Sequence, residues 1–187
     1  MGYTGGEKEF PTYHSLGNHT EALQVDFDPL QVSFADIVDL FWQSHNPLRG
    51  VRSRQYMTAI WFHDESQAEV INGAKKAIER ELDTTVQTPV MPLNMFYLAE
   101  DYHQKYGLQN CLLMRFFKEM YPDFEDFNNS TAAARVNGFI GGNGSRELFK
   151  QESSSYGIPV DELKQFVRSQ ETSNGRARCS GDRCTIE

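Results

Sequence analysis

The sequence predicts a mixed α/β fold, because strand-like and helix-like patterns alternate along roughly its first hundred residues. Residues 22–28 alternate apolar and polar side chains, as a half-buried strand does. Residues 34–41 repeat apolar side chains at helical spacing. The order strand, helix, strand, helix, strand predicts one layer of helices on a sheet.

The strand at residues 22–28 would place Leu23, Val25 and Phe27 on its buried face. Ser33, with Asp36 three residues later, predicts a capping box at the start of the first helix. This helix would run to about residue 45, where Asn46-Pro47 stops it. Its buried face would consist of Phe34, Ile37, Val38 and Phe41.

A second strand is predicted at residues 58–62, and Asp64 with Gln67 marks the start of a second helix. Residues 84–92 are expected to be extended. The inner face of the second helix would consist of Ile71, Ala74, Ile78 and Leu82.

The pattern changes after a predicted strand at residues 95–97 and a helix at 99–106, in which Glu100 would be a helix-start charge. Further helices are expected at residues 111–120, 124–136 and 159–168, with a glycine-rich turn at 138–144. The polar residues 171–187 are expected to form a disordered tail.

The composition is that of an acidic chain of ordinary hydrophobicity. Its 187 residues suffice for a domain with a proper core, and its net charge is −8. This charge argues against nucleic-acid and anionic-membrane partners, which bind basic surfaces. No apolar run approaches the ~18 residues of a membrane span. No signal peptide is visible, so we expect a cytoplasmic protein.

The three cysteines are too few, and odd in number, for a disulfide scaffold, so a reducing compartment is expected. Cys111 begins an apolar helix and is expected to be buried and inert. The histidines have no spacing that is typical of a metal site, so we expect no bound metal.

The first 21 residues concentrate groups that suit a binding or catalytic loop. They contain the Gly5-Gly6 pair, the phenol of Tyr13, His19 and the carboxyl group of Glu21, and they lead into the first predicted strand. Functional groups are often placed on loops that a rigid element positions.

Several segments in order resemble the peptide methionine sulfoxide reductase A family. They read GYTGG, PTY and HTE in the first 21 residues, followed by FWQSHNP, RQY and FYLAEDYHQKY, and they span residues 2–107. The resemblance implies a ferredoxin-like α/β plait over residues 1–107. It leaves residues 108–170 as a helical extension packed on that domain.

This sequence departs from the family pattern in two respects. The Gly-Cys-Phe-Trp segment that supplies the family's nucleophile is absent, so we expect the plait to lack its first strand and helix. The family's aspartate before the second tyrosine is also absent, since residues 51–56 contain no carboxylate.

The resemblance implies reduction of methionine S-sulfoxide in peptides and proteins. Glu21 would be the acid, with a pKa that burial raises, and Tyr13 and Tyr56 would donate hydrogen bonds to the sulfoxide oxygen. His19, Trp42 and His45 would support substrate binding. The residues alone leave another interpretation open: Trp42 could be a core residue, and His19 and His45 could be structural histidines.

Cys179 and Cys184 would form a resolving pair that a dithiol such as thioredoxin recycles, with no bound cofactor. Inert tail thiols are the alternative. We expect a monomer. Two other interpretations of the whole chain stay open, which are a non-catalytic binding protein derived from the family and an incomplete gene product.

Overall fold

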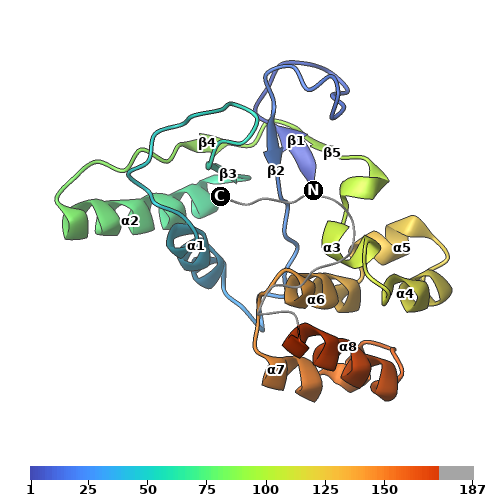
Figure 1. Ribbon diagram of the computed structural model, residues 1–187. Coiled ribbons are helices and arrows are strands. Elements are labelled where there is room, and N and C mark those ends of the chain that lie inside the picture. The colour runs from blue at the N-terminus through green and yellow to red at the C-terminus, as the bar shows by residue number, and fades with distance from the viewer. Residues whose placement is uncertain (173–187) are drawn as a thin grey trace. The chain divides into compact units, whose positions relative to one another are not determined.

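The computed structural model describes residues 1–172, with side chains through residue 168. The chain forms two compact units, Met1–Glu100 and a second that begins at Asp101. This division comes before the boundary after residue 107 that the sequence suggested. The mixed α/β class is confirmed, since the first unit holds all described strands and the second is helical (Figure 1).

The strands of the first unit form two small sheets instead of the single sheet predicted. Strand β1 (Gly2–Thr4) lies between β2 (Thr20–Ala22) and β5 (Phe96–Leu98), antiparallel to both. Strand β3 (Ile60–Phe62) pairs in parallel with β4 (Val90–Pro92). The register of the larger sheet sets Tyr3 opposite both Glu21 and Tyr97.

The prediction of a strand at residues 22–28 was wrong beyond its first residue. Strand β2 ends at Ala22, and Leu23 and Val25 are 68% and 52% exposed. Among the described strands, none pairs with residues 23–28. Alternating side chains form a regular strand only where a neighbour takes up the backbone hydrogen bonds and covers the apolar face.

The two long helices of the first unit begin where their caps predicted. Helix α1 (Phe34–Gln43) has the complete capping box of Ser33, and Asp64 caps α2 (Glu65–Leu82) by accepting from the backbone of Gln67. Both helices contribute to one apolar core, whose buried members are Val38, Trp42, Ile71 and Val86. Leu82 was predicted to face inward but is exposed, because it ends the helix beyond this core.

The second unit is built from short helices. The predicted helix at residues 99–106 is wrong, since Lys105 has a φ of 46° and separates the 3₁₀ turn η1 (Asp101–His103) from α3 (Tyr106–Gln109). The remaining helices are α4 (Met114–Met120), α5 (Phe124–Asn129), α6 (Thr131–Ile140), α7 (Arg146–Gln151), the 3₁₀ turn η2 (Ser153–Ser155) and α8 (Val160–Thr172).

A serine divides what the apolar spacing predicted as one helix at residues 124–136. Ser130 is extended and accepts a hydrogen bond from the backbone of Ala133, so it ends α5 and caps α6. The helix α6 continues to Ile140, so the glycine-rich turn begins at Gly141 instead of residue 138. The helices enclose a core that includes Leu108, Phe117, Phe127 and Val136.

No helix within residues 1–172 is both long enough and apolar enough to cross a membrane.

Replacing Ser33 with alanine is expected to lower the free energy of unfolding by about 1 kcal/mol, because the cap of α1 would be lost. Denaturant unfolding followed by tryptophan fluorescence measures this, since Trp42 lies in α1. The matched control is Ser53→Ala at an exposed position, which should change stability by less than about 0.5 kcal/mol. Equal effects of the two substitutions would contradict the role of the cap.

Candidate active site

The loop between β1 and β2 is organised around a buried histidine. His19 is 1% exposed, and its Nδ1 accepts a hydrogen bond from the backbone N–H of Gly6 at 3.2 Å. Its Nε2 therefore carries the proton and donates to the carbonyl of Lys8 at 2.7 Å. Both ring nitrogens are thus hydrogen-bonded within the loop, so His19 acts as a structural histidine.

Residues 54 and 55 lie alongside β2. The hydroxyl of Thr20 donates to the carbonyl of Arg54 at 2.8 Å, and the N–H of Glu21 donates to the carbonyl of Gln55 at 2.9 Å. The guanidinium of Arg54 donates to the carbonyl of Asn18 at 2.9 Å and to that of Gly5. These bonds hold the segment that carries Tyr56 against the loop that carries Tyr13 and Glu21.

The structure brings Glu21, Tyr13 and Tyr56 together. Hydrogen bonding with the Tyr13 hydroxyl, then burial and the charge of Glu21, raises the pKa of Tyr56 from its ordinary 10.0 to about 12. Side-chain hydrogen bonding with Glu21 makes the smallest contribution to this rise in the pKa of Tyr56. It remains 63% exposed, so a ligand can reach this cluster from solvent.

Gln55 joins the carboxyl group to the phenol, and sequence reasoning missed it. Its Nε2 donates to Oε1 of Glu21 at 2.8 Å and to the hydroxyl of Tyr56 at 3.0 Å. Gln55 therefore holds one oxygen of the Glu21 carboxyl group and the phenol of Tyr56 at the same time. The only signal in the sequence is the position of Gln55 directly before Tyr56.

Glu100 holds the backbone of Tyr13. Sequence reasoning had interpreted this glutamate as a charge at the start of a helix. Instead it follows β5, where its Oε1 accepts from the backbone N–H of Tyr13 at 3.0 Å. Its Oε2 accepts from the buried hydroxyl of Tyr3 at 2.6 Å. The carboxylate thus ties the tyrosine loop to the three-stranded sheet.

Of the residues expected to support substrate binding, Trp42 lies in the α1–α2 core and His45 packs beside it against Phe41 and Trp42. Trp42 is 6% exposed and packs in the cluster with Val38 and Ile71. His45 donates from Nδ1 to the carbonyl of Phe41 at 2.8 Å and accepts at Nε2 from Thr88 at 2.9 Å. The hydrogen bonds and ring contacts described for the two side chains do not include Glu21, Tyr13 or Tyr56.

Among the described residues, Cys111 is a cysteine of the second unit. It is half-buried against the apolar core of that unit, and its thiol is free. Cys179 and Cys184 lie outside the described residues. In the described part of the chain, no three His, Cys, Asp or Glu residues form a group that could hold a metal ion.

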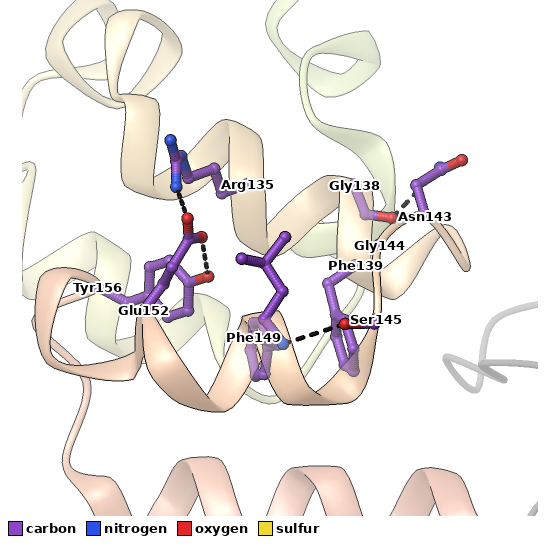
Figure 2. A pocket seen from close by; sticks show the side chains of 10 residues that line it. Arg135, Gly138, Phe139, Asn143, Gly144, Ser145, Phe149, Glu152 and Tyr156 are labelled. Atoms are coloured by element: carbon purple, nitrogen blue, oxygen red, sulfur yellow. Dashed lines mark hydrogen bonds and ion pairs between the residues drawn. The ribbon is translucent and has the colours of Figure 1, made fainter. Parts of the chain in front are cut away.

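The second unit contains a separate cavity of about 320 Å³, which is lined by residues of α6, of α7 and of the turn between them, and by Glu152 and Tyr156. Glu152 lies there between the guanidinium of Arg135 and the hydroxyl of Tyr156, which donates at 2.9 Å (Figure 2). The bond from Arg135 holds the pKa of Glu152 below its usual range, and burial raises the pKa of Tyr156 to about 12. These polar groups satisfy one another, so the cavity shows no reactive arrangement.

Replacing Tyr13 with phenylalanine is expected to lower the pKa of Tyr56, because the largest cause of its rise is the hydrogen bond to Tyr13. The ultraviolet absorbance of tyrosinate, taken as a difference from Tyr56→Phe, isolates this one phenol. Since the folded-state pKa lies above the unfolded value, the stabilisation is present below pH 10.0 and lost as the pH rises toward about 12. An unchanged midpoint would show that Tyr13 does not contact Tyr56.

The cluster of a carboxyl group, two phenols and an amide can hold and protonate one oxygen atom of a ligand. A phenol is a neutral donor, and a carboxyl group delivers a proton when its pKa suits the working pH. The arrangement therefore fits a reaction in which an oxygen leaves or develops negative charge.

Comparison with known sequences assigns the chain to a family. The model of the family described as peptide methionine sulfoxide reductase matches residues 1–135, so the similarity continues into α6 of the second unit. A peptide methionine sulfoxide reductase of Drosophila melanogaster is 37% identical over 160 residues, which are 84% of this chain and 64% of the relative.

The similarity extends to archaeal and bacterial proteins. A relative of the same name from Methanosarcina acetivorans is 36% identical over 64% of this chain and 71% of its own length. One from Vibrio parahaemolyticus is 35% identical over 59% of this chain and 58% of its own length. The chain thus spans about three fifths of the Drosophila and Vibrio proteins. Since the family model matches residues 1–135, the chain belongs to the peptide methionine sulfoxide reductase family.

Proposed function

We propose that the protein takes part in the thiol-dependent reduction of methionine S-sulfoxide in peptides and proteins, and that the cluster around Glu21 binds and protonates the sulfoxide oxygen. The observation that carries this proposal is the convergence of Tyr13, Tyr56 and Glu21, with Gln55 bonded to the last two. No prosthetic group is required, because a thiol supplies both electrons.

The proposed reaction balances with a thiol as the reductant. A thiolate attacks the sulfur of the sulfoxide, and the sulfur–oxygen bond of the substrate breaks as a new one forms on the attacking sulfur. One proton reaches the oxygen from Glu21, and the phenols hold that oxygen during the transfer. The products are the thioether and a sulfenic acid, which a second thiol converts to a disulfide and water.

The sources of the two thiols are further parts of the proposal. Cys179 and Cys184 each directly follow an arginine, Arg178 and Arg183, which favours thiolates, and we assign the two cysteines to the resolving and recycling steps. A dithiol protein such as thioredoxin would reduce their disulfide. A monomer in the cytoplasm suits this exchange, since each disulfide must be exposed to its reductant.

The direct test incubates the purified chain with dithiothreitol and a peptide that contains either epimer of methionine sulfoxide. Selective loss of the S epimer supports the proposal. Serine variants of Cys111, Cys179 and Cys184, singly and together, then identify the attacking thiol. Turnover that survives the loss of all three would contradict a thiol of this chain as the attacker.

A binding protein derived from the family is the second candidate. It is favoured by the absence of a carboxylate from residues 51–56, the segment that leads to Tyr56. Binding of the S-sulfoxide peptide without turnover, measured by fluorescence anisotropy with excess dithiothreitol, would establish this function. Failure to bind either epimer would contradict both proposals.

A further inference from the structure

The loop that leads to Tyr56 has an unusual charge for this protein. Residues 40–63 contain no aspartate or glutamate but carry Arg49, Arg52 and Arg54, although the whole chain has 26 acidic and 18 basic residues. A basic loop in an acidic chain provides a local site for negative charge.

The three arginines do different things. Arg54 is engaged with the carbonyl groups of Gly5 and Asn18, so it holds the loops together. Arg49 and Arg52 are exposed, and within residues 1–172 their side chains make no hydrogen bond or ion pair. Two guanidinium groups therefore remain for a ligand, and a planar guanidinium pairs best with a carboxylate or phosphate.

We propose that Arg49 and Arg52 select peptides in which acidic residues flank the oxidised methionine. This inference rests on the proposed function, and it names the substrate class for the same site.

The distances along the chain suit this assignment. Arg52 precedes Tyr56 by four residues, so their Cα atoms are at most roughly 14 Å apart. An extended peptide advances about 3.3 Å per residue, which puts side chains two to four residues from the sulfoxide roughly 7–13 Å away. A carboxylate at those positions would come within reach of the long side chain of Arg52.

The acidic character of the whole chain does not cancel this local attraction. At physiological ionic strength, charges separated by more than about 8 Å are largely screened from one another. The attraction of a carboxylate to the neighbouring guanidinium of Arg52 is therefore stronger than its repulsion by distant acidic groups. Exposed ion pairs are individually weak, so the selection should be a preference and not an absolute requirement.

The test compares peptides that share one methionine S-sulfoxide and differ only in the residues two to four positions away, which are glutamate, glutamine or lysine. Binding by fluorescence anisotropy, and reduction where turnover occurs, should be about threefold to tenfold better for the glutamate peptide than for the glutamine peptide, since two charged pairs are added. The advantage should shrink as salt is raised, because exposed pairs are screened.

Variants then locate the preference. Arg52→Gln should remove most of the difference between the glutamate and glutamine peptides, and Arg52→Glu should favour the lysine peptide. The matched control is Arg80→Gln in α2, which makes the same change in net charge at an exposed position of the same unit. The control should keep the full preference.

The outcomes separate this inference from the proposed function. Equal use of the three peptides, or an unchanged preference in the Arg49→Gln/Arg52→Gln variant, would overturn the inference and leave the function standing. Loss of binding to all sulfoxide peptides would overturn both. A single-stranded DNA that competes as well as the glutamate peptide would show a general anion site instead of a peptide site.

Discussion

Glu21→Gln is expected to slow the reduction of a methionine S-sulfoxide peptide by about 100-fold to 10,000-fold, the usual contribution of a positioned acid. Glutamine preserves the size of the side chain but has no acidic proton. The described partner of the Glu21 carboxyl group is Gln55, which donates to Oε1. An amide cannot take over the role of an acid when Glu21 is replaced. Single-turnover reduction followed by chromatography of the peptide measures the change.

Peptide binding separates this loss of chemistry from a loss of structure. Glu21→Gln should bind the sulfoxide peptide within several-fold of the wild type, because the hydrogen bonds of the phenols are retained. Glu69→Gln, an exposed position on α2, makes the same chemical change away from the cluster and should leave the rate unaltered. A Glu21→Gln variant that retains more than about a tenth of the rate would exclude Glu21 as the acid.

Phe117→Ala is expected to lower the free energy of unfolding of the second unit by about 3–5 kcal/mol. Phe117 is 0% exposed in the core of that unit and has ring contacts with Tyr121 and Phe127. Its removal forfeits the burial of an aromatic ring and leaves a cavity. Denaturant unfolding followed by far-ultraviolet circular dichroism measures the loss.

A second probe assigns that loss to one unit. Trp42 and Trp61 both lie in the first unit, so their fluorescence reports its unfolding independently of the helical signal. Leu112→Ala, at a side chain that is 87% exposed, should change stability by less than about 0.5 kcal/mol. A shift below about 1 kcal/mol for Phe117→Ala would show that this core is loosely packed.

Local chemistry predicted the helices of the first unit better than its strands. The caps at Ser33 and Asp64 depend on residues three positions apart, and both are present in the structure. The segment at residues 23–28 alternates as a strand should, but a strand also requires a neighbour, and no pattern within the segment supplies one. The break at Lys105 was missed because helical spacing does not indicate a residue with positive φ.

Sequence reasoning anticipated which side chains meet in the cluster but not the residues that support them. Glu21, Tyr13 and Tyr56 were expected to converge, and the structure places them together, while their catalytic roles belong to the proposed function. Gln55 and Glu100 bind partners that are 34 and 87 residues away along the chain, so no local spacing could identify their hydrogen bonds. Their roles depend on how the strands bring distant segments together.

The loop between Pro47 and Arg54 is fastened at both ends by bonds to main-chain oxygens. The N–H of Gln87 donates to the carbonyl of Pro47 at 2.8 Å, and Thr20 donates to that of Arg54 at 2.8 Å. Neither bond depends on the side chains in between, so this stretch can change in length or charge among related proteins while Glu21 keeps its position. Under the proposed function, descendants of one ancestor would thereby diverge in the peptides they accept while the cluster around Glu21 stays unchanged.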